Sequence, residues 1–182
     1  MSVVSRFLYG FDLSLKNTGL TIYDLDNKDF VYIGSFSTEK IYATKENKGL
    51  YLNGVKLKKI IDWIKPIMKK YPPTQIVIER GFSRFNTETQ VVFRCHGIIN
   101  CLFWNVPQEY YAVKEVKATI YKGDATKAQV QKIIKNNFID VEFANEDESD
   151  SFAVALTYLI KENLIEFEKP IVEKKKRKKK SE

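Results

Sequence analysis

The stretch Phe7-Leu8-Tyr9-Gly10-Phe11-Asp12 decides the fold. Its first five residues form an almost continuous apolar run, which is typical of a β-strand that is covered on both faces. An aspartate follows at once, so the run ends in a carboxylate at an edge of the sheet. The stretch therefore predicts a buried strand inside an α/β domain, with an acidic group at the strand end.

The segments that follow predict the rest of the sheet. Residues 20–23 and 31–34 alternate apolar and polar side chains on either side of a turn at 24–28, so they form an antiparallel meander with the first strand. Residues 75–79 form a fourth strand that also ends in a carboxylate, and residues 110–113 form a short fifth. We expect an α/β fold with a mixed five-stranded sheet, in which the three-strand antiparallel meander is joined by two parallel strands and flanked by helices.

Apolar residues at helical spacing predict the helices. The first helix is long, and Pro66 is expected to kink it. Thr126 and Gln129 fit a capping box, in which both side chains satisfy backbone N–H groups at a helix start. The sequence holds no G-x-G-x-x-G or G-x-x-x-x-G-K motif, which excludes the common nucleotide-binding loops. The helices are expected at about residues 48–70, 91–103, 114–120, 126–138 and 147–162.

Length and charge favour one domain with a basic tail. The 182 residues, 44% of them hydrophobic, suffice for a single core, which we place at residues 1–168. The formal net charge is +7, but residues 173–182 hold seven basic and two acidic residues, a net of +5. We expect residues 169–182 to be a disordered basic tail that adds salt-sensitive phosphate contacts.

The sequence also indicates the surroundings in which the protein works. Its apolar runs are shorter than the ~20 residues that a membrane helix needs, and its first residues lack the pattern of a secretory signal. Cys95 and Cys101 form no C-x-x-C pair, which argues against a zinc site and a disulfide. We expect a cytoplasmic protein without a membrane partner and with reduced thiols. His96 is interpreted as an ordinary helical residue rather than a catalytic one.

Four carboxylates are the strongest functional signal. Asp12 and Glu79 each end an apolar strand, and adjacent strand ends meet at one edge of a sheet. Asp147 and Asp150 are three residues apart, so they lie on one face of the last helix. If this helix crosses the sheet edge, all four converge into a site for Mg²⁺, which prefers oxygen ligands. The alternative is that Asp147 and Asp150 only complement the positive end of the helix dipole and that Asp12 is a turn residue.

These residues belong to a longer ordered pattern. From residue 6 to about residue 160 the chain resembles the RuvC-type Holliday junction resolvases of the ribonuclease H-like superfamily. Each motif alone is weak, but the ordered set is specific. The matching segments are Gly10-Phe-Asp12 with Thr18-Gly19, Ile76-Val-Ile-Glu79 with Phe82, Tyr111-Ala-Val with Val116-Lys117, Thr126-Lys127-Ala-Gln-Val130, and Asp147-x-x-Asp150 leading into Phe152-Ala-Val-Ala-Leu156.

The resemblance implies a catalytic centre. Asp12, Glu79, Asp147 and Asp150 would bind two Mg²⁺ ions, for which Mn²⁺ can substitute, and Lys127 would act beside them. One ion would activate the attacking water and the other would stabilise the leaving 3′ oxygen, so the products would carry 5′-phosphates.

The resemblance also implies contacts with DNA. Lys117 and Lys127 match lysines that contact phosphates near the scissile bond, although either could instead be a solvated helix lysine. Phe82 matches an aromatic side chain that stacks on an opened base. Arg80 and Arg84, beside it in the sequence, fit a track for DNA phosphates. The implied partners are branched DNA and a second copy of the chain, with the helix at 91–103 as the dimer surface.

One departure from the family pattern lies directly after the first aspartate, where Leu13-Ser14 replaces the Pro-Gly that is common there. This change puts close sequence preference at the cleavage point in doubt and suggests a divergent phage or viral branch. We expect a divalent-metal-dependent endonuclease that resolves four-way junctions by paired nicking. The alternatives are a broader endonuclease on branched or flap DNA and a non-catalytic protein that binds DNA structures on the same fold.

Overall fold

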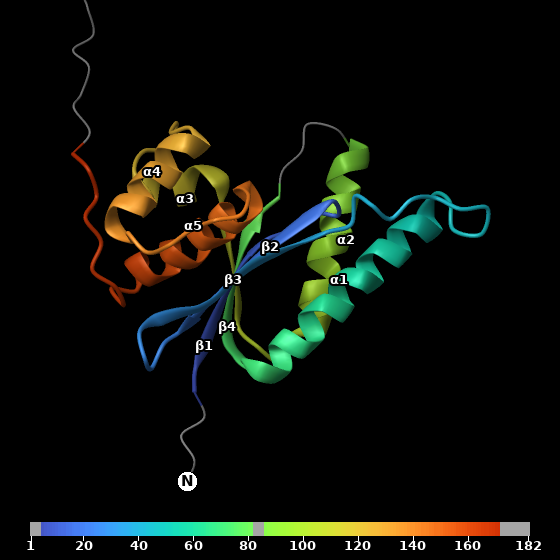
Figure 1. Ribbon diagram of the computed structural model, residues 1–182, viewed down its shortest axis with the longest axis horizontal. Coiled ribbons are helices and arrows are strands. Elements are labelled where there is room, and N and C mark those ends of the chain that lie inside the picture. The colour runs from blue at the N-terminus through green and yellow to red at the C-terminus, as the bar shows by residue number, and fades with distance from the viewer. Residues whose placement is uncertain (1–4, 82–85, 172–182) are drawn as a thin grey trace, which may run out of the picture.

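Strand β1 (Phe7–Asp12) lies in the middle of a five-stranded sheet of order β3-β2-β1-β4-β5 (Figure 1). The computed structural model describes residues 5–81 and 86–171. The other strands are β2 (Asn17–Asp24), β3 (Asp29–Ser37), β4 (Pro73–Arg80) and β5 (Gln108–Ala112). The helices are α1 (Leu50–Lys70), α2 (Asn86–Leu102), α3 (Val113–Ile120), α4 (Lys127–Asn137) and α5 (Glu146–Lys161).

The pairing of β1 confirms the predicted mixed sheet. On one side β1 pairs antiparallel with β2, so that Asp12 faces Gly19, and β2 continues antiparallel to β3. On the other side β1 pairs parallel with β4, where Phe11 faces Ile78, and β4 is parallel to β5. Because β1 and β4 are parallel neighbours, their carboxyl ends finish side by side at one edge of the sheet.

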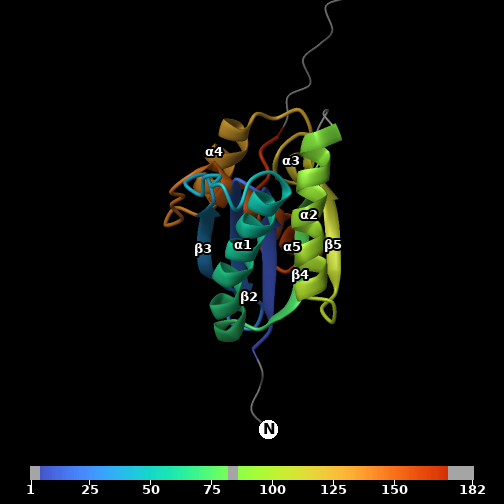
Figure 2. The same ribbon diagram turned by 90° about the vertical axis from the view of Figure 1, so that its right-hand side faces the viewer.

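Alternate residues of β1 enter two separate hydrophobic cores. Tyr9 and Phe11 pack with the buried Ile60 and Ile64 of α1 and with residues of α2, such as Ile99. Figure 2 shows α1 and α2 in front of the sheet, with α5 behind it. This arrangement explains why the first strand is apolar on both faces, as the sequence predicted.

The opposite face of the sheet holds the second core. Leu8 of β1 packs there with Val77 of β4 and with Phe152 and Leu156 of α5. Helices α3 and α4 add Val116, Ile120, Val130, Ile133 and Ile134 to the same cluster.

Two glycines allow α5 to lie directly on the sheet. A Cβ atom added at Gly10 would lie 2.6 Å from Cβ of Ala155, and one added at Gly19 would lie 2.1 Å from the carbonyl oxygen of Asp147. Real side chains do not come this close, so only glycine fits at these two positions. The close approach brings the first turn of α5 next to the end of β1.

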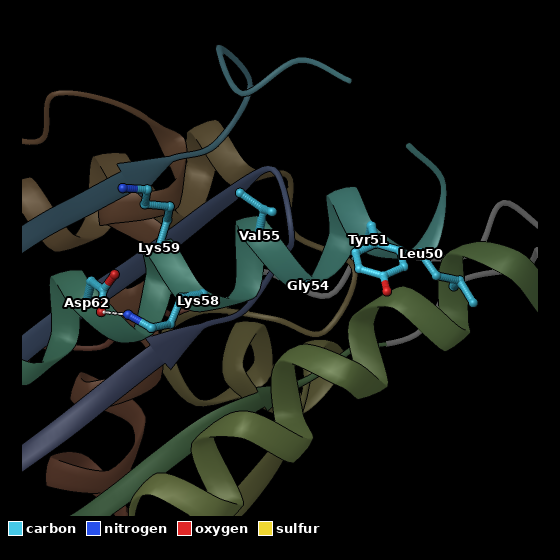
Figure 3. A pocket seen from close by; sticks show the side chains of 7 residues that line it. All are labelled: Leu50, Tyr51, Gly54, Val55, Lys58, Lys59 and Asp62. Carbon is cyan, nitrogen blue, oxygen red and sulfur yellow. Dashed lines mark hydrogen bonds and ion pairs between the residues drawn. The ribbon is translucent and has the colours of Figure 1, made fainter. Parts of the chain in front are cut away.

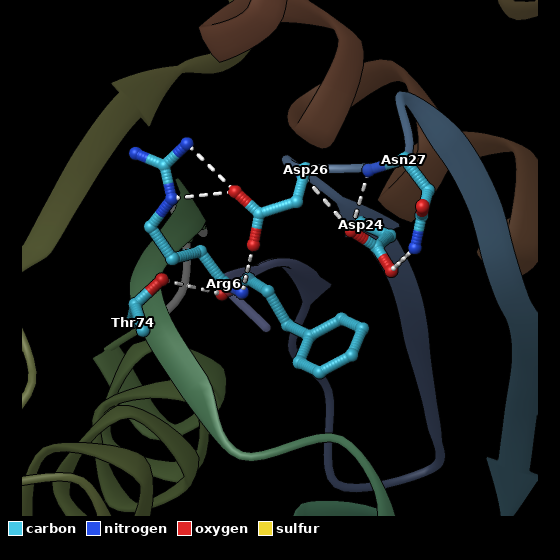
Figure 4. A network of polar contacts seen from close by, with 6 residues as sticks. Arg6, Asp24, Asp26, Asn27 and Thr74 are labelled. Carbon is cyan, nitrogen blue, oxygen red and sulfur yellow. Dashed lines mark hydrogen bonds and ion pairs between the residues drawn. The ribbon is translucent and has the colours of Figure 1, made fainter. Parts of the chain in front are cut away.

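A polar network secures the other end of β1, away from the acidic edge (Figure 4). The backbone N–H and the side-chain Nε of Arg6 both donate to the Asp26 carboxylate at 2.8 Å. The Asp24 carboxylate accepts from the backbone N–H groups of Asp26 and Asn27, both at 2.9 Å. These bonds fix the turn between β2 and β3, because the Asp24 side chain replaces part of the backbone turn pairing.

The helices agree with the sequence patterns, including the helix that contains a proline. The capping box is confirmed: Gln129 N–H donates to the Thr126 hydroxyl at 3.2 Å, and Thr126 N–H donates to Gln129 Oε1 at 3.0 Å. Pro66 lies inside α1, which continues through it to Lys70, and the expected kink at this residue stays a prediction. Proline removes one backbone donor, and four further residues of helix beyond it still place Ile67 and Met68 against the core.

The described residues end shortly after the predicted domain boundary. Asn137 Nδ2 donates to the Glu168 carbonyl oxygen at 3.2 Å, and Glu168 N–H donates back to Asn137 Oδ1 at 2.8 Å. The Lys169 ammonium donates to the carbonyl oxygen of Ala118. Most of the basic tail, residues 172–182, lies outside the described residues, so the boundary stays a prediction. Within residues 5–81 and 86–171 no helix is long and apolar enough to cross a bilayer.

Candidate active site

Three separate elements bring the predicted carboxylates together. Asp12 is the last residue of β1, and Glu79 is the second-last residue of β4, the neighbouring parallel strand. Asp147 and Asp150 lie in the first two turns of α5, which contacts both β1 and β2. All four residues are half-buried, so each remains partly accessible to solvent. Asp12, Glu79 and Asp150 line a cavity of about 180 Å³ with Lys117, Lys127, Val113, Val116, Val130 and Ala153.

Local sequence fixes the position at which α5 begins. Asn145 is the N-cap, because its side-chain oxygen accepts from the Glu148 backbone N–H at 3.1 Å. The buried hydroxyls of Ser151 and Thr21 lie 2.9 Å apart, which ties α5 to β2. Acidic side chains in the first turn are favoured by the helix dipole, so the same feature that stabilises this helix also supplies carboxylates to the site.

The carboxylates are close enough to change each other's protonation. Burial raises the pKa of Asp12 to about 8, and the negative charges of Glu79, Asp150 and Asp147 add to this rise. Burial and Asp150 raise the pKa of Glu79 to about 7, while Lys127 and Lys117 oppose the rise. Burial also raises the pKa of Asp147, against the effect of Lys127. A surface with scattered acids would not show this mutual repulsion.

Lys127 forms the cationic counterpart of the cluster. Its ammonium group donates to Asp150 Oδ2 at 2.6 Å and to Glu146 Oε2 at 3.3 Å. Burial lowers the pKa of Lys127, but these hydrogen bonds outweigh it and raise the pKa above its ordinary value. The pairing shows that the pocket attracts positive charge, and it engages an oxygen of Asp150 that a metal ion would need.

The donor set fits hard divalent cations. Carboxylate oxygens are the ligands that Mg²⁺ takes from proteins, and it usually keeps several waters beside one or two of them. Among the described residues, no three side chains of the Asp, Glu, His and Cys types are already arranged around a single point. The hydrogen bond from the Lys127 ammonium group occupies one oxygen of Asp150 that could otherwise face a cation.

The metal-free protein should lose stability as pH rises. The folded-state pKa values of Asp12 and Glu79 are raised above their ordinary values, so the unfolded chain releases these protons first. The free energy of unfolding therefore falls from about pH 4 to about pH 8. Asp12→Asn removes part of this loss, and thermal melting in EDTA should show it melting about 5 °C higher than wild type at pH 8.

The control for this prediction is the same comparison at about pH 3, where Asp12 is mostly protonated in both the folded and the unfolded chain and the two proteins should melt together. A Tm gain that is equal at both pH values would mean that the variant stabilises the fold for a reason other than charge. No gain at pH 8 would mean that Asp12 is not buried among other carboxylates.

Glu148 holds the start of α5 in place, and the sequence did not reveal this role. Four acidic residues lie between Glu146 and Asp150, and their order in the sequence does not show which side chains face the site. Glu148 is buried and points to β3 instead: Oε1 accepts from the Ser35 hydroxyl at 3.1 Å, and Oε2 accepts from the Ala144 backbone N–H at 2.7 Å. The N-cap Asn145 also donates to the Ser35 hydroxyl, at 2.7 Å. Glu148 differs from the neighbouring acidic residues by its contact with β3. No pattern in the nearby sequence predicts a contact with a residue so far away in the chain.

Ser35→Ala should weaken the attachment of the start of α5 to β3 without changing any residue of the acidic cluster. The substitution removes two hydrogen bonds at the start of α5, so we expect the free energy of unfolding to fall by about 1–2 kcal/mol. We also expect divalent ions to stabilise the variant less than they stabilise wild type, because Asp147 and Asp150 are held less firmly. Urea unfolding with and without metal measures both effects. Ser37→Ala, two residues further along β3, is the matched control, and an equal effect there would remove the special role of Ser35.

The predicted DNA-contacting residues divide into three groups. Lys117 and Lys127 line the acidic cavity, and their contact with a phosphate stays a prediction. Arg80 is exposed and lines a different cavity, beside Phe93 and His96 of α2, so its contact with phosphate stays a prediction. Phe82 and Arg84 lie outside the described residues.

His96 and the cysteines stay outside the acidic cavity. His96 is buried, and its ring stacks on Tyr110 with 5.5 Å between ring centroids. Burial lowers its pKa, and its Nε2 has no hydrogen-bond partner in the described part of the chain. Cys95 is buried and Cys101 exposed, and both are free thiols. None of these three residues lines the cavity that holds Asp12 and Glu79.

The sheet order and the carboxylates at its edge define a ribonuclease H-like domain. The family model of the crossover junction endodeoxyribonuclease RuvC matches residues 8–158. The chain therefore belongs to the RuvC family, as the ordered motifs predicted.

Curated relatives and solved structures agree with this assignment. The RuvC protein of an Acidovorax species is 25% identical over 157 residues, which cover 83% of each chain. The structure of Thermus thermophilus RuvC in complex with a Holliday junction substrate matches with a TM-score of 0.69 at 15% identity, over 87% of this chain and 96% of that one. Fowlpox virus resolvase, also in complex with a Holliday junction, matches with a TM-score of 0.51 at 15% identity, over 87% and 99%. At these identities the structural matches support the fold.

Proposed function

We propose that this protein is a divalent-metal-dependent endonuclease that resolves four-way DNA junctions. The observation that carries the proposal is the convergence of Asp12, Glu79 and Asp150 on one cavity with Lys117 and Lys127. Carboxylates that come close together repel one another, so without a bound cation this arrangement lowers the stability of the fold. Family membership gives this cluster a chemical purpose, because RuvC relatives are named as crossover junction endodeoxyribonucleases.

Asp12, Glu79, Asp147 and Asp150 are the residues that would hold two Mg²⁺ or Mn²⁺ ions. When bound there, the ions neutralise the scissile phosphate and supply a hydroxide-like water at neutral pH. The protein positions this chemistry: β1 and β4 fix two carboxylates on rigid strand ends, and α5 presents the other two across them. The apolar side chains of Val113, Val116 and Val130 line the same cavity and limit access of bulk water.

The two lysines would act on the substrate. Lys117 lies in the cavity without an ion pair to any described residue, so its ammonium group is available to a phosphate oxygen. Lys127 is held by Asp150 and Glu146. If Asp150 were to help hold a cation, Lys127 would be free to contact the phosphate that carries the scissile bond, where its positive charge would stabilise the extra negative charge of the transition state.

Paired nicking of opposed strands requires two active sites, so the proposal includes a homodimer. Helix α2 is the best candidate surface, because Phe93 is 58% exposed there and flanks a cavity of about 500 Å³ lined by Arg80, His96 and Tyr110. An aromatic side chain next to a cavity suits a self-complementary contact. A mass measurement in solution, with and without junction DNA, tests the dimer separately from the chemistry.

A cleavage assay tests the function. A synthetic four-way junction with one labelled strand per experiment is incubated with the protein in Mg²⁺, in Mn²⁺ or in EDTA. We expect symmetric nicks that leave ligatable 5′-phosphate ends in either metal and no product in EDTA. Forks and flaps in parallel reactions show whether the enzyme is specific for junctions or acts on branched DNA more broadly. Binding without product, together with no thermal stabilisation by divalent ions, would contradict the proposal and favour a non-catalytic junction-binding protein.

A further inference from the structure

The start of α1 carries an exposed aromatic and basic surface that the catalytic proposal does not use. Leu50 and Tyr51 are 71% and 76% exposed, although large apolar and aromatic side chains are normally covered. They border a cavity of about 690 Å³ that continues along α1 past Gly54 to Lys58 and Lys59. The other lining residues are Val55 and Asp62, and we call this set of seven residues the α1 platform (Figure 3).

Positive charge gathers around the α1 platform. Residues 39–59 contain six lysines and two glutamates, a net charge of +4. The tail at 173–182 carries +5 of the total of +7, so the remaining residues outside both segments sum to −2. Outside the tail, the excess of positive over negative charge is therefore found in this segment. Such an excess of positive charge attracts a polyanion such as a nucleic acid, whereas a second copy that presented the same basic surface would be repelled.

The order of side chains along α1 suits a nucleotide. Tyr51, Gly54, Val55 and Lys58 follow one another at helical spacing on one face. No atom lies within 4 Å of a Cβ built at Gly54, so the middle of this face is open. Figure 3 shows the ring of Tyr51 at one end and Lys58, paired with Asp62, at the other. A base stacked on the ring would direct its phosphates along the helix toward Lys58 and Lys59.

The α1 platform also lies toward the end of the molecule at which β1 and β4 finish. Both ribbon views place the beginning of α1 at that end, while Lys69 and Lys70 in its last turn lie at the other (Figures 1 and 2). Tyr42, 74% exposed, precedes α1 in the same basic segment. A strand that leaves the acidic cavity on this side would meet two exposed tyrosines among lysines, the combination that binds single strands without reading their sequence.

We propose that the α1 platform binds an unpaired DNA strand next to the branch point, with a base stacked on Tyr51 and phosphates held by Lys59 and its neighbours. This inference rests on the proposed function, because it assumes that branched DNA occupies the acidic cavity. It adds a preference that the cavity alone does not give: branches with a single-stranded arm bind more tightly than fully paired junctions.

The test measures binding by the full-length chain with Asp12→Asn, so that nothing is cut. Fluorescence anisotropy compares a fully paired four-way junction with the same junction in which one arm is a single strand. We expect Tyr51→Ala to weaken binding of the single-stranded form by about 5- to 100-fold and to leave the fully paired form within about twofold. Tyr51→Phe keeps the stacking ring and should bind like the parent. Lys59→Gln should lower the salt slope by about 0.7, the loss of one contact to a single strand.

Two controls separate this role from others. Lys69→Gln changes one lysine in the last turn of the same helix and should affect neither substrate. The oligomeric state of the DNA-free protein, measured as its molar mass in solution, should be the same with Tyr51→Ala as without it. The proposal is overturned if Tyr51→Ala binds both substrates as the parent does or loses affinity for both equally. It is also overturned if the variant changes its oligomeric state, because the surface would then be a contact with a second copy. Nicking of the fully paired junction by wild type is a separate measurement, so failure of the proposed function would be recognised independently.

Discussion

Asp12→Asn should abolish nicking of a four-way junction while the variant still binds it. Asp12 contributes a rigid strand-end carboxylate to a cavity that also contains Glu79 and Asp150. Losing a ligand charge there removes several kcal/mol of transition-state stabilisation, which corresponds to a decrease in rate of about a thousandfold or more. Binding should persist or tighten, because the amide removes one negative charge from the surface that meets the phosphates. Single-turnover cleavage and anisotropy on the same labelled junction measure the two effects.

Asp26→Asn is the matched control for this experiment. Asp26 is also an aspartate next to a strand end, but it pairs with Arg6 at the opposite end of the sheet (Figure 4). Its replacement should leave the cleavage rate unchanged. Equal cleavage by Asp12→Asn and wild type would remove Asp12 from the mechanism, and with it the reason for treating the acidic edge as the catalytic site.

Gly19→Ala should have the largest effect on the fold for a single added methyl group. The new Cβ would lie 2.1 Å from the carbonyl oxygen and 2.7 Å from the carbonyl carbon of Asp147. Both are backbone atoms of α5, so no side-chain rotation can relieve the overlap, and the helix has to move away from β2. We expect the free energy of unfolding to fall by roughly 3 kcal/mol, which lowers the Tm by about 10 °C.

The same displacement should also reduce catalysis. Moving the first turn of α5 takes Asp147 and Asp150 away from Asp12, so the variant should nick poorly even at temperatures at which it is fully folded. Gly54→Ala is the control, because nothing lies near that position and alanine should stabilise the helix by about 0.5–1 kcal/mol. Melting and nicking of Gly19→Ala at wild-type levels would mean that α5 does not need this close approach.

Part of the site could be predicted because it depends on local sequence. An apolar run that ends in an acid indicates a buried strand with a carboxylate at its end, and this pattern located Asp12 and Glu79. Helical spacing placed Asp147 and Asp150 on one face, and a capping pattern located the start of α4, which carries Lys127. The ordered set of motifs was sufficient to predict the family and the fold, and the family match and the sheet order confirm both.

Other features escaped prediction because they depend on contacts between distant segments. The role of Glu148 requires Ser35 on β3, 113 residues away. The ion pair of Lys127 with Asp150 joins α4 and α5, and the two residues lie 23 positions apart in the sequence.

The sequence by itself determined the elements, their order, and the acids that end β1 and β4, because strand and helix periodicity and the chemistry of caps are encoded within short stretches. Only the tertiary structure decided that these acids share one cavity with Lys117 and Lys127, that Glu148 turns away from it, and that α1 exposes Tyr51 beside its lysines. The physical reason is that convergence depends on how closely α5 can approach the sheet. That distance is set by the absence of side chains at Gly10 and Gly19. It can be recognised only in the folded protein, where α5 lies against the sheet.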